Sequence, residues 1–351
     1  MAIFRTFGSN PSGKELEKIK TSPNYRDRVF QNLSHTEQLA KGASMLKIMW
    51  RFFNKPTNTE PPIPLPSAKT DLLSFKSDKP FIIWFGHSSY FIHINGKNIL
   101  VDPVFCGYAS PFSFTGHSFK GSDIYTADDF PVIDILILTH DHYDHLDYKT
   151  VVNLSTKTKN ICTSLGVGSH LRYWGIDPAI ISEFDWWDSK QITGDTATSS
   201  VEIIAAPARH FSGRSFTRNK TLWSSFILKP GDYSIYIGAD SGYDSHFKTI
   251  GEKYGPFDIA MLESGQYNEW WPYIHMMPEQ TVQAAIDLKA KVLMPVHWGK
   301  FALGLHPWDE PIKRVVVKAN ELNVKLATPM IGQPVILDSS YPNEQWWLLV
   351  K

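Results

Sequence analysis

The stretch "LTHDHYDHLD", residues 138–147, carries three histidines and three aspartates within ten residues. It directly follows "VIDILI", residues 132–137, whose nearly continuous apolar character predicts a buried strand. Its centre has the pattern H-x-H-x-D-H, and imidazole and carboxylate groups are standard ligands of zinc and related metals. A chain of this composition contains such a pattern by chance in roughly one case in a thousand. The sequence therefore predicts a metal site on the loop that leaves this strand.

Four ligand residues cannot fill two metal sites, and the chain offers three more at matching positions. Each of the three follows an apolar run: "VEIIAAPAR" precedes His210, "YSIYIGA" precedes Asp240 and "KVLMPV" precedes His297. Taken alone, each is equally compatible with a structural polar residue. Together with H-x-H-x-D-H they are predicted to be metal ligands. The predicted set is His140, His142, Asp144, His145, His210, Asp240 and His297.

This set resembles the metallo-β-lactamase fold superfamily. The stretches "WFGHSSYFIHINGKNILVDPVF", "IGADSGYD" and "PVHWGKFALGLHPWDEP" resemble the branch that contains N-acyl-phosphatidylethanolamine phospholipase D and its bacterial relatives. The resemblance covers roughly residues 79–340 and part of the preceding segment. It implies two divalent metal ions, one held by His140, His142 and His210, the other by Asp144, His145 and His297, with Asp240 bridging both. Zinc is the expected metal, and iron or manganese are alternatives because they accept the same ligands.

Two such cations lie about 3.5–4 Å apart, hold a water between them and lower its pKa toward neutrality. The resulting hydroxide can attack phosphorus or a carbonyl carbon. Asp240 would fix the separation of the metals, and Asp144 could also orient the hydroxide. These two aspartates are the predicted catalytic residues.

Five further residues have a predicted role beside an ordinary structural one. Asp102, in "LVDP", either orients the histidine loop by hydrogen bonds or forms a turn before proline. His87 either faces the site or stabilises a turn. His275 and His306 lie on loops expected to surround the metals, where each binds the substrate or makes loop hydrogen bonds. Tyr143 either contacts substrate or packs sideways.

The order of elements predicts an α+β fold, a four-layer αββα sandwich with an N-terminal extension. Residues 1–78 form the extension, with an amphipathic helix and a Pro-rich linker, and residues 79–351 form the catalytic domain. Asn95-Gly96 predicts a tight hairpin turn, Asp147 an N-cap for a helix over "YKTVVNLS", and "EQWWLLV" a closing strand.

Charge and hydropathy exclude several classes of function. Lys+Arg and Asp+Glu both number 35, so no overall field gathers nucleic acid. No apolar run of about 18 residues predicts a transmembrane segment. Because the N-terminus turns polar after four residues and only two cysteines occur, we expect a cytoplasmic protein. The helix "MLKIMWRFF", residues 45–53, either contacts a membrane surface through its apolar groups and basic residues or packs over the catalytic domain.

The predicted function is metal-dependent hydrolysis of a small-molecule or lipid phosphodiester, similar to phospholipase D. A lactonase that opens a cyclic ester on the same centre is one alternative. A non-catalytic regulatory protein that keeps the metals is another, although the intact ligand set disfavours it.

Overall fold

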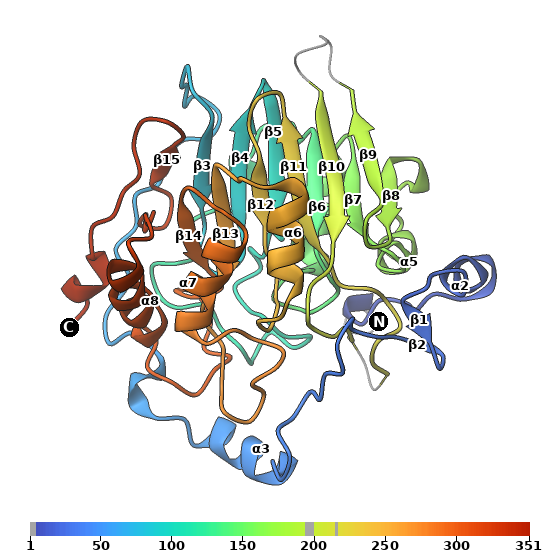
Figure 1. Ribbon diagram of the computed structural model, residues 1–351, viewed down its shortest axis with the longest axis horizontal. Coiled ribbons are helices and arrows are strands. Elements are labelled where there is room, and N and C mark those ends of the chain that lie inside the picture. The colour runs from blue at the N-terminus through green and yellow to red at the C-terminus, as the bar shows by residue number, and fades with distance from the viewer. Residues whose placement is uncertain (1–4, 194–199, 215–216) are drawn as a thin grey trace.

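The computed structural model describes residues 5–193, 200–214 and 217–351, and two mixed β-sheets form its centre (Figure 1). One sheet has the strand order β15 (Pro334–Ile336), β3 (Phe81–Trp84), β4 (Tyr90–Ile94), β5 (Lys97–Val101), β6 (Ile135–Leu138), β7 (Ile161–Ser164) and β8 (Ile181–Phe184). The other has the order β14 (Leu293–Val296), β13 (Ile259–Glu263), β12 (Ile235–Ile237), β11 (Ser225–Pro230), β10 (Val201–Ala206) and β9 (Ser189–Ile192).

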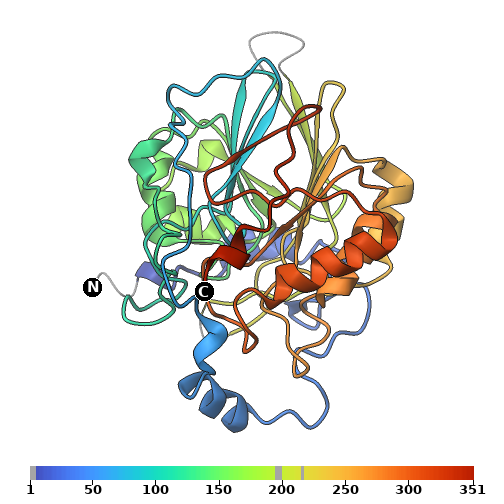
Figure 2. The same cartoon turned by 90° about the vertical axis from the view of Figure 1, so that its left-hand side faces the viewer.

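Alternation along the strands explains how the sheets stack. In β6, Ile135 and Ile137 pack into the core between the two sheets, while Leu136 and Leu138 pack on the opposite face. That outer face is covered by α4 (Tyr148–Ser155) and α5 (Gly168–Tyr173). The outer face of the second sheet is covered by α6 (His246–Tyr254), α7 (Pro278–Asp287) and α8 (Glu310–Leu322). Figure 2 shows the four layers edge-on, which confirms the predicted αββα sandwich.

Local signals in the sequence also form as predicted, with one exception. Asn95 and Gly96 take positive φ angles of 50° and 68° and join β4 to β5. Asp147 caps α4 by accepting a hydrogen bond from the Lys149 N–H at 3.0 Å. The closing strand predicted from "EQWWLLV" is wrong, because Trp346–Leu349 form a 3₁₀ helix. Trp346 and Trp347 are both buried in the core, whereas neighbouring residues of a strand point to opposite faces.

The strand directions place the loops that carry the predicted metal ligands at one end of the sandwich. Strands β5 to β8 run parallel, β12 to β14 run parallel, and β10 runs the same way as β12 because both are antiparallel to β11. Their carboxyl ends therefore meet at the edge that lies lowest in Figure 1, beside α3 (Met45–Phe53).

The segment before β3 lies against this same end. Its first part contains α2 (Gly13–Ile19) and the hairpin β1 (Tyr25–Arg26) and β2 (Val29–Phe30), and it packs through Ile19 and Phe30 against Leu165 and Trp223. Ile48 of α3 packs on Trp271. No helix in the described ranges is long and apolar enough to cross a membrane.

Candidate metal centre

Four segments converge where the strands end. The histidine loop follows β6, His210 lies four residues after β10, and Asp240 lies three after β12, while His297 follows β14 directly. Asp240 is central: its carboxylate lies 3.2 Å from His145 Nε2, 2.9 Å from His297 Nδ1, and 3.8 and 3.6 Å from the Nε2 atoms of His140 and His210.

The seven predicted ligands fall into two groups of mutually close atoms. In each group the ligand atoms lie within 4.8 Å of one another. The first group is His140, His142, His210 and Asp240, and the second is His87, Asp144, His145 and His297. A third such group joins Asp240 and His297 to Glu263 and His275. The first two groups contain all seven predicted ligands and add His87 to them.

The hydrogen bonds around the first group show that its inward nitrogens carry lone pairs. His210 Nδ1–H donates to the Ile274 carbonyl oxygen at 2.8 Å, which leaves Nε2 of a neutral imidazole as an acceptor. Thr139 donates its hydroxyl to Asp102 and can only accept from His140 Nδ1, so His140 Nε2 is also an acceptor. These two atoms lie 3.1 and 3.0 Å from His142 Nδ1, where at most one of the two contacts can be a hydrogen bond.

His145 differs from these two histidines. Its Nδ1 donates to Asp102 at 2.8 Å, and its buried Nε2 lies 3.2 Å from Asp240 and 3.5 Å from Asp144. Burial disfavours the charged ring, but the two carboxylates outweigh burial and raise the pKa of His145 well above its ordinary value, so a metal at this position would replace a proton. A cluster of buried lone pairs and carboxylates is unfavourable by itself, and a divalent cation in each group removes the repulsion. The residues present therefore fit two divalent metal ions.

The surroundings keep three of the histidines neutral and two of the aspartates ionised, which are the protonation states that bind metal. Burial lowers the pKa of His140, His142 and His210 below that of an ordinary imidazole, so they stay neutral. Burial opposes ionisation of Asp144 and Asp240, but the adjacent imidazoles outweigh it and hold the pKa of both carboxyls well below the usual range.

Two residues behind the ligands hold them in place. Asp102 accepts hydrogen bonds from the Thr139 N–H at 2.8 Å and hydroxyl at 2.6 Å as well as from His145. His87 is fully buried, and its Nε2 lies 2.8 Å from Asp144 Oδ2. Burial lowers the pKa of His87 to about 3, so its neutral ring donates to Asp144 from within the protein and does not line the cavity.

Of the three remaining residues predicted to bind substrate, two line the cavity and one does not. His275 lines the cavity and donates from Nδ1 to Glu263 at 2.8 Å. Burial disfavours protonation of His275, but the Glu263 carboxylate outweighs burial and raises the His275 pKa to about 9. Tyr143 also lines the cavity, although its hydroxyl donates to the Arg214 carbonyl. His306 is not brought to this cavity: its ring stacks on Tyr267, 4.3 Å between centroids.

Some residues that build the site do not stand out in the sequence. Asn32, in the extension, accepts from the His210 N–H at 3.0 Å and donates to the His210 carbonyl at 2.8 Å. Asp141, between two ligands, accepts from the Gly213 N–H at 2.7 Å. Glu263 ends an apolar strand, so the rule that found His297 could have found it. For Asn32, no local signal in the sequence exists.

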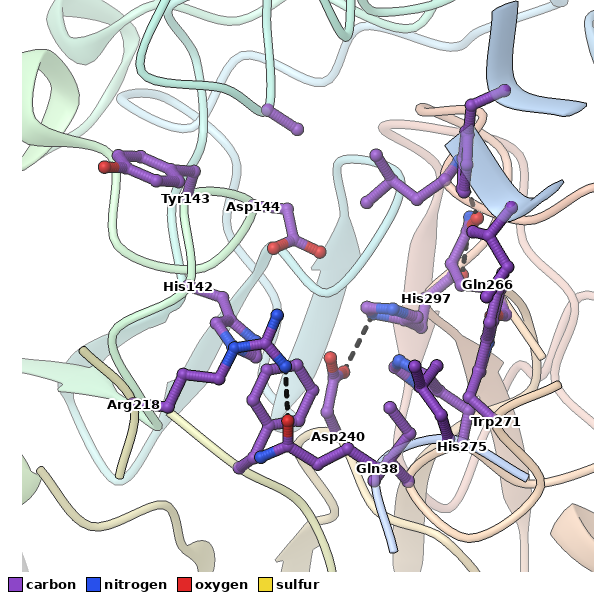
Figure 3. A pocket seen from close by; sticks show the side chains of 17 residues that line it. Gln38, His142, Tyr143, Asp144, Arg218, Asp240, Gln266, Trp271, His275 and His297 are labelled. Carbon is purple, nitrogen blue, oxygen red and sulfur yellow. Dashed lines mark hydrogen bonds and ion pairs between the residues drawn. The ribbon is translucent and has the colours of Figure 1, made fainter. Parts of the chain in front are cut away.

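A cavity of about 390 Å³ opens over the metal-ligand groups (Figure 3). His142, Asp144, Asp240, His275 and His297 form its polar side. Apolar side chains from the extension and from two later loops form much of the rest: Leu39, Ile48, Phe52, Trp271, Ile274 and Leu303. The cavity is thus polar at the metal centre and apolar along its walls.

Comparison with known proteins assigns the chain to a family. The family model described as "Beta-lactamase superfamily domain" matches residues 97–298, more than half of the chain and all seven predicted ligands. The chain belongs to the β-lactamase superfamily. With the metal-ligand groups described above, this membership makes it a metal-dependent hydrolase of the metallo-β-lactamase family.

Two relatives in sequence and one in structure show what this superfamily member is similar to. It is 37% identical over 333 residues to an uncharacterized protein of Mycobacterium tuberculosis, a match that covers 93% of this chain and 88% of the other. It is 30% identical over 234 residues to N-acyl-phosphatidylethanolamine-hydrolyzing phospholipase D 1 of Caenorhabditis elegans, covering 64% of this chain and 65% of that protein. Its fold is similar to that of Igni18, a metallo hydrolase of Ignicoccus hospitalis, with a TM-score of 0.57 and 19% identity, over 75% of this chain and 100% of that chain.

Proposed function

We propose that this protein is a phosphodiesterase of the phospholipase D type, which hydrolyses a small-molecule or lipid phosphodiester at a centre of two divalent metals. The observation that carries the proposal is the cavity itself, in which the metal-ligand groups lie beside an apolar wall formed by Ile48, Phe52 and Trp271. This combination suits a charged phosphodiester with an apolar substituent. The similarity to a phospholipase D supports the same substrate class.

The proposed metal ligands are those predicted from the sequence, with Asp240 between the two sites: His140, His142 and His210 at one, and Asp144, His145 and His297 at the other. Two divalent cations, zinc or alternatively iron or manganese, supply an acidified water and stabilise negative charge on oxygen when bound. Asp144 lines the cavity and would orient the attacking water, while His87 holds its Oδ2.

His275 would protonate the leaving oxygen. Its Nδ1 donates to Glu263, whose Oε1 accepts a hydrogen bond from the Met276 N–H at 2.9 Å. The Met276 N–H thus holds the Glu263 carboxylate in place, and the carboxylate orients the His275 ring. The Nε2–H is then free to donate toward the cavity. A general acid in this position typically accelerates departure of an alkoxide by 10²–10⁴-fold, about 3–5 kcal/mol of the barrier.

Helix α3 would hold the cavity mouth against a membrane that contains the substrate. Ile48 and Phe52 point to the cavity, whereas Leu46, Met49 and Trp50, spaced three and four residues apart, form an exposed apolar face. Lys47 and Arg51 lie beside this face and suit anionic headgroups.

The test uses purified protein and begins with a count of metals per chain, expected to be two. An aryl phosphodiester, an N-acyl phosphatidylethanolamine and a homoserine lactone are then assayed in parallel with the D240N variant. Turnover of the phosphodiesters, lost in D240N, supports the proposal. Turnover of the lactone alone replaces it with a lactonase, and two bound metals without any turnover favour a regulatory metal-binding protein.

A further inference from the structure

Arg218 lies at the mouth of the same cavity in unusual surroundings for an arginine. Its guanidinium donates to the Gln38 side-chain oxygen and lies 5.2 Å from the centre of the Phe211 ring. Both partners are neutral. Figure 3 shows the guanidinium extending into the cavity, where a dashed line joins it to Gln38.

Other arginines near this end of the molecule have anionic or carbonyl partners. The guanidinium of Arg209 lies 3.7 Å from Asp244, and that of Arg172 lies 3.1 Å from Glu183. Arg214 is buried and donates to the carbonyl oxygens of Asp141 and Leu146 at 2.8 and 2.7 Å. The hydrogen bond to Gln38 uses one of the five N–H groups that a guanidinium carries in a fork suited to phosphate and carboxylate oxygens.

Arg218 lies close to the candidate metal centre. The Phe211 ring contacts both the guanidinium of Arg218 and the imidazole of His142, whose ring centre lies 4.5 Å away. This cation and a proposed metal ligand therefore contact the same aromatic ring. The apolar wall at Ile48 and Trp271 also lines the cavity, so a ligand within it can contact metal centre, cation and wall together.

We propose that Arg218 and Gln38 form an anion-binding subsite that takes a phosphate or carboxylate oxygen of the substrate while the reacting group lies at the metal centre. On binding, the guanidinium exchanges its neutral amide acceptor for a charged one, and charge-assisted hydrogen bonds are roughly twice as strong. The identity of the substrate rests on the proposed function, whereas anion binding does not require turnover.

The test measures the affinity of the zinc-loaded protein for inorganic phosphate and phenylphosphonate by calorimetry, at low and high salt. R218Q should bind both anions about 10–100-fold more weakly, with unchanged zinc content, and should lose much of the salt dependence. R218K, which keeps the charge without the fork, should be intermediate. The matched control is R26Q, because Arg26 is exposed on β1, outside the cavity lining, and the net charge changes equally.

Steady-state hydrolysis of an aryl phosphodiester separates this inference from the proposed function. A higher KM in R218Q, with a smaller change in kcat, supports both. Phosphate affinity that depends on Arg218 in a protein without phosphodiesterase activity keeps the subsite and rejects the function. Phosphate affinity and KM equal to wild type in R218Q, with zinc content intact, would falsify the subsite, whether or not the diester is hydrolysed.

Discussion

At the scale of single residues, the candidate metal centre also depends on side chains that are not metal ligands but hold the ligands in position. Asn32 binds both the N–H and the carbonyl of His210, and its oxygen also accepts from Trp223 Nε1 at 3.1 Å. The amide thus fixes the backbone of a proposed metal ligand from a position 178 residues earlier in the chain. Removing it leaves buried backbone groups of His210 unpaired.

We expect N32A to bind metal about 10–100-fold more weakly, the effect typical of losing a residue that orients a ligand. Competition with a fluorescent chelator measures this affinity directly. N24A is the matched control, because Asn24 is an extension residue that bonds to Asp185, away from the ligands. Equal chelator resistance of N32A and N24A would contradict the role assigned to Asn32.

A second prediction concerns His275 as the proton donor. H275Q should lower kcat for an alkyl phosphodiester by 10²-fold or more, because an alkoxide leaves poorly without a proton. An aryl phosphodiester, whose phenolate leaves unprotonated, should be affected much less. H306Q is the control, since His306 packs on Tyr267 outside the cavity. An equal loss with both substrates would mean that His275 only holds the site together.

The residues of the site differ in how well the sequence reveals them. The proposed ligands Asp240 and His297 lie within three residues of the ends of apolar strands, and strand ends meet at one edge of a sheet, so the pattern predicts their convergence. His87 also follows a strand, but only the fold shows that it lies behind Asp144, away from the cavity. Asn32 and Arg218 cannot be predicted, because their roles arise from contacts between distant segments.

At the scale of elements, helix α3 has two apolar faces and only one of them is covered. The residues Leu46, Met49 and Trp50 are 79%, 50% and 64% exposed. Burying such side chains in a membrane interface yields roughly 1.5–3 kcal/mol each at full burial, enough for reversible binding.

The triple variant L46S/M49S/W50S should therefore bind anionic vesicles at least about tenfold more weakly than wild type, measured by flotation. The control V317S/L322S removes exposed apolar residues of α8, on the outer helical layer, and should bind as wild type does. Hydrolysis of a soluble aryl diester should be unchanged in both variants. If wild type fails to float with vesicles, α3 serves only to cover the catalytic domain.

Elements were predictable where one local signal dominated. Strand β6 is continuously apolar, and α4 begins at a side-chain cap. Strands β8 and β9 are mostly polar, so alternation gives no clear prediction for "ISEF" and "SKQI". The turn at Trp346–Leu349 follows from tertiary packing, since the Trp346 ring stacks on Trp298 with centroids 5.2 Å apart. Long-range packing decides such segments, and a single sequence does not contain it.

At the scale of the whole molecule, the candidate metal centre joins residues of the two sheets and of the segment before β3. Asp144 comes from the first sheet, Asp240 and His297 from the second, and Asn32 from the extension. Metal ions bound here would connect all three parts in the folded state only. Their binding free energy would then add to the free energy of unfolding.

Metal removal should accordingly destabilise the entire protein. At a free metal concentration of about 1,000 times Kd, each site contributes about 4 kcal/mol, so two sites contribute about 8 kcal/mol. With an unfolding entropy of about 2 cal/mol/K per residue, each kcal/mol corresponds to roughly 1.4 °C in Tm for a chain of 351 residues. We expect a chelator to lower Tm by roughly 10 °C, and zinc, manganese or ferrous iron to restore it. D240N should show a smaller shift, because it loses a carboxylate of the first group that also lies 3.2 Å from His145 and 2.9 Å from His297 of the second. A wild-type Tm unaffected by verified metal removal would show that the ligand groups are stable without cations, which the facing lone pairs of His140 and His210 argue against.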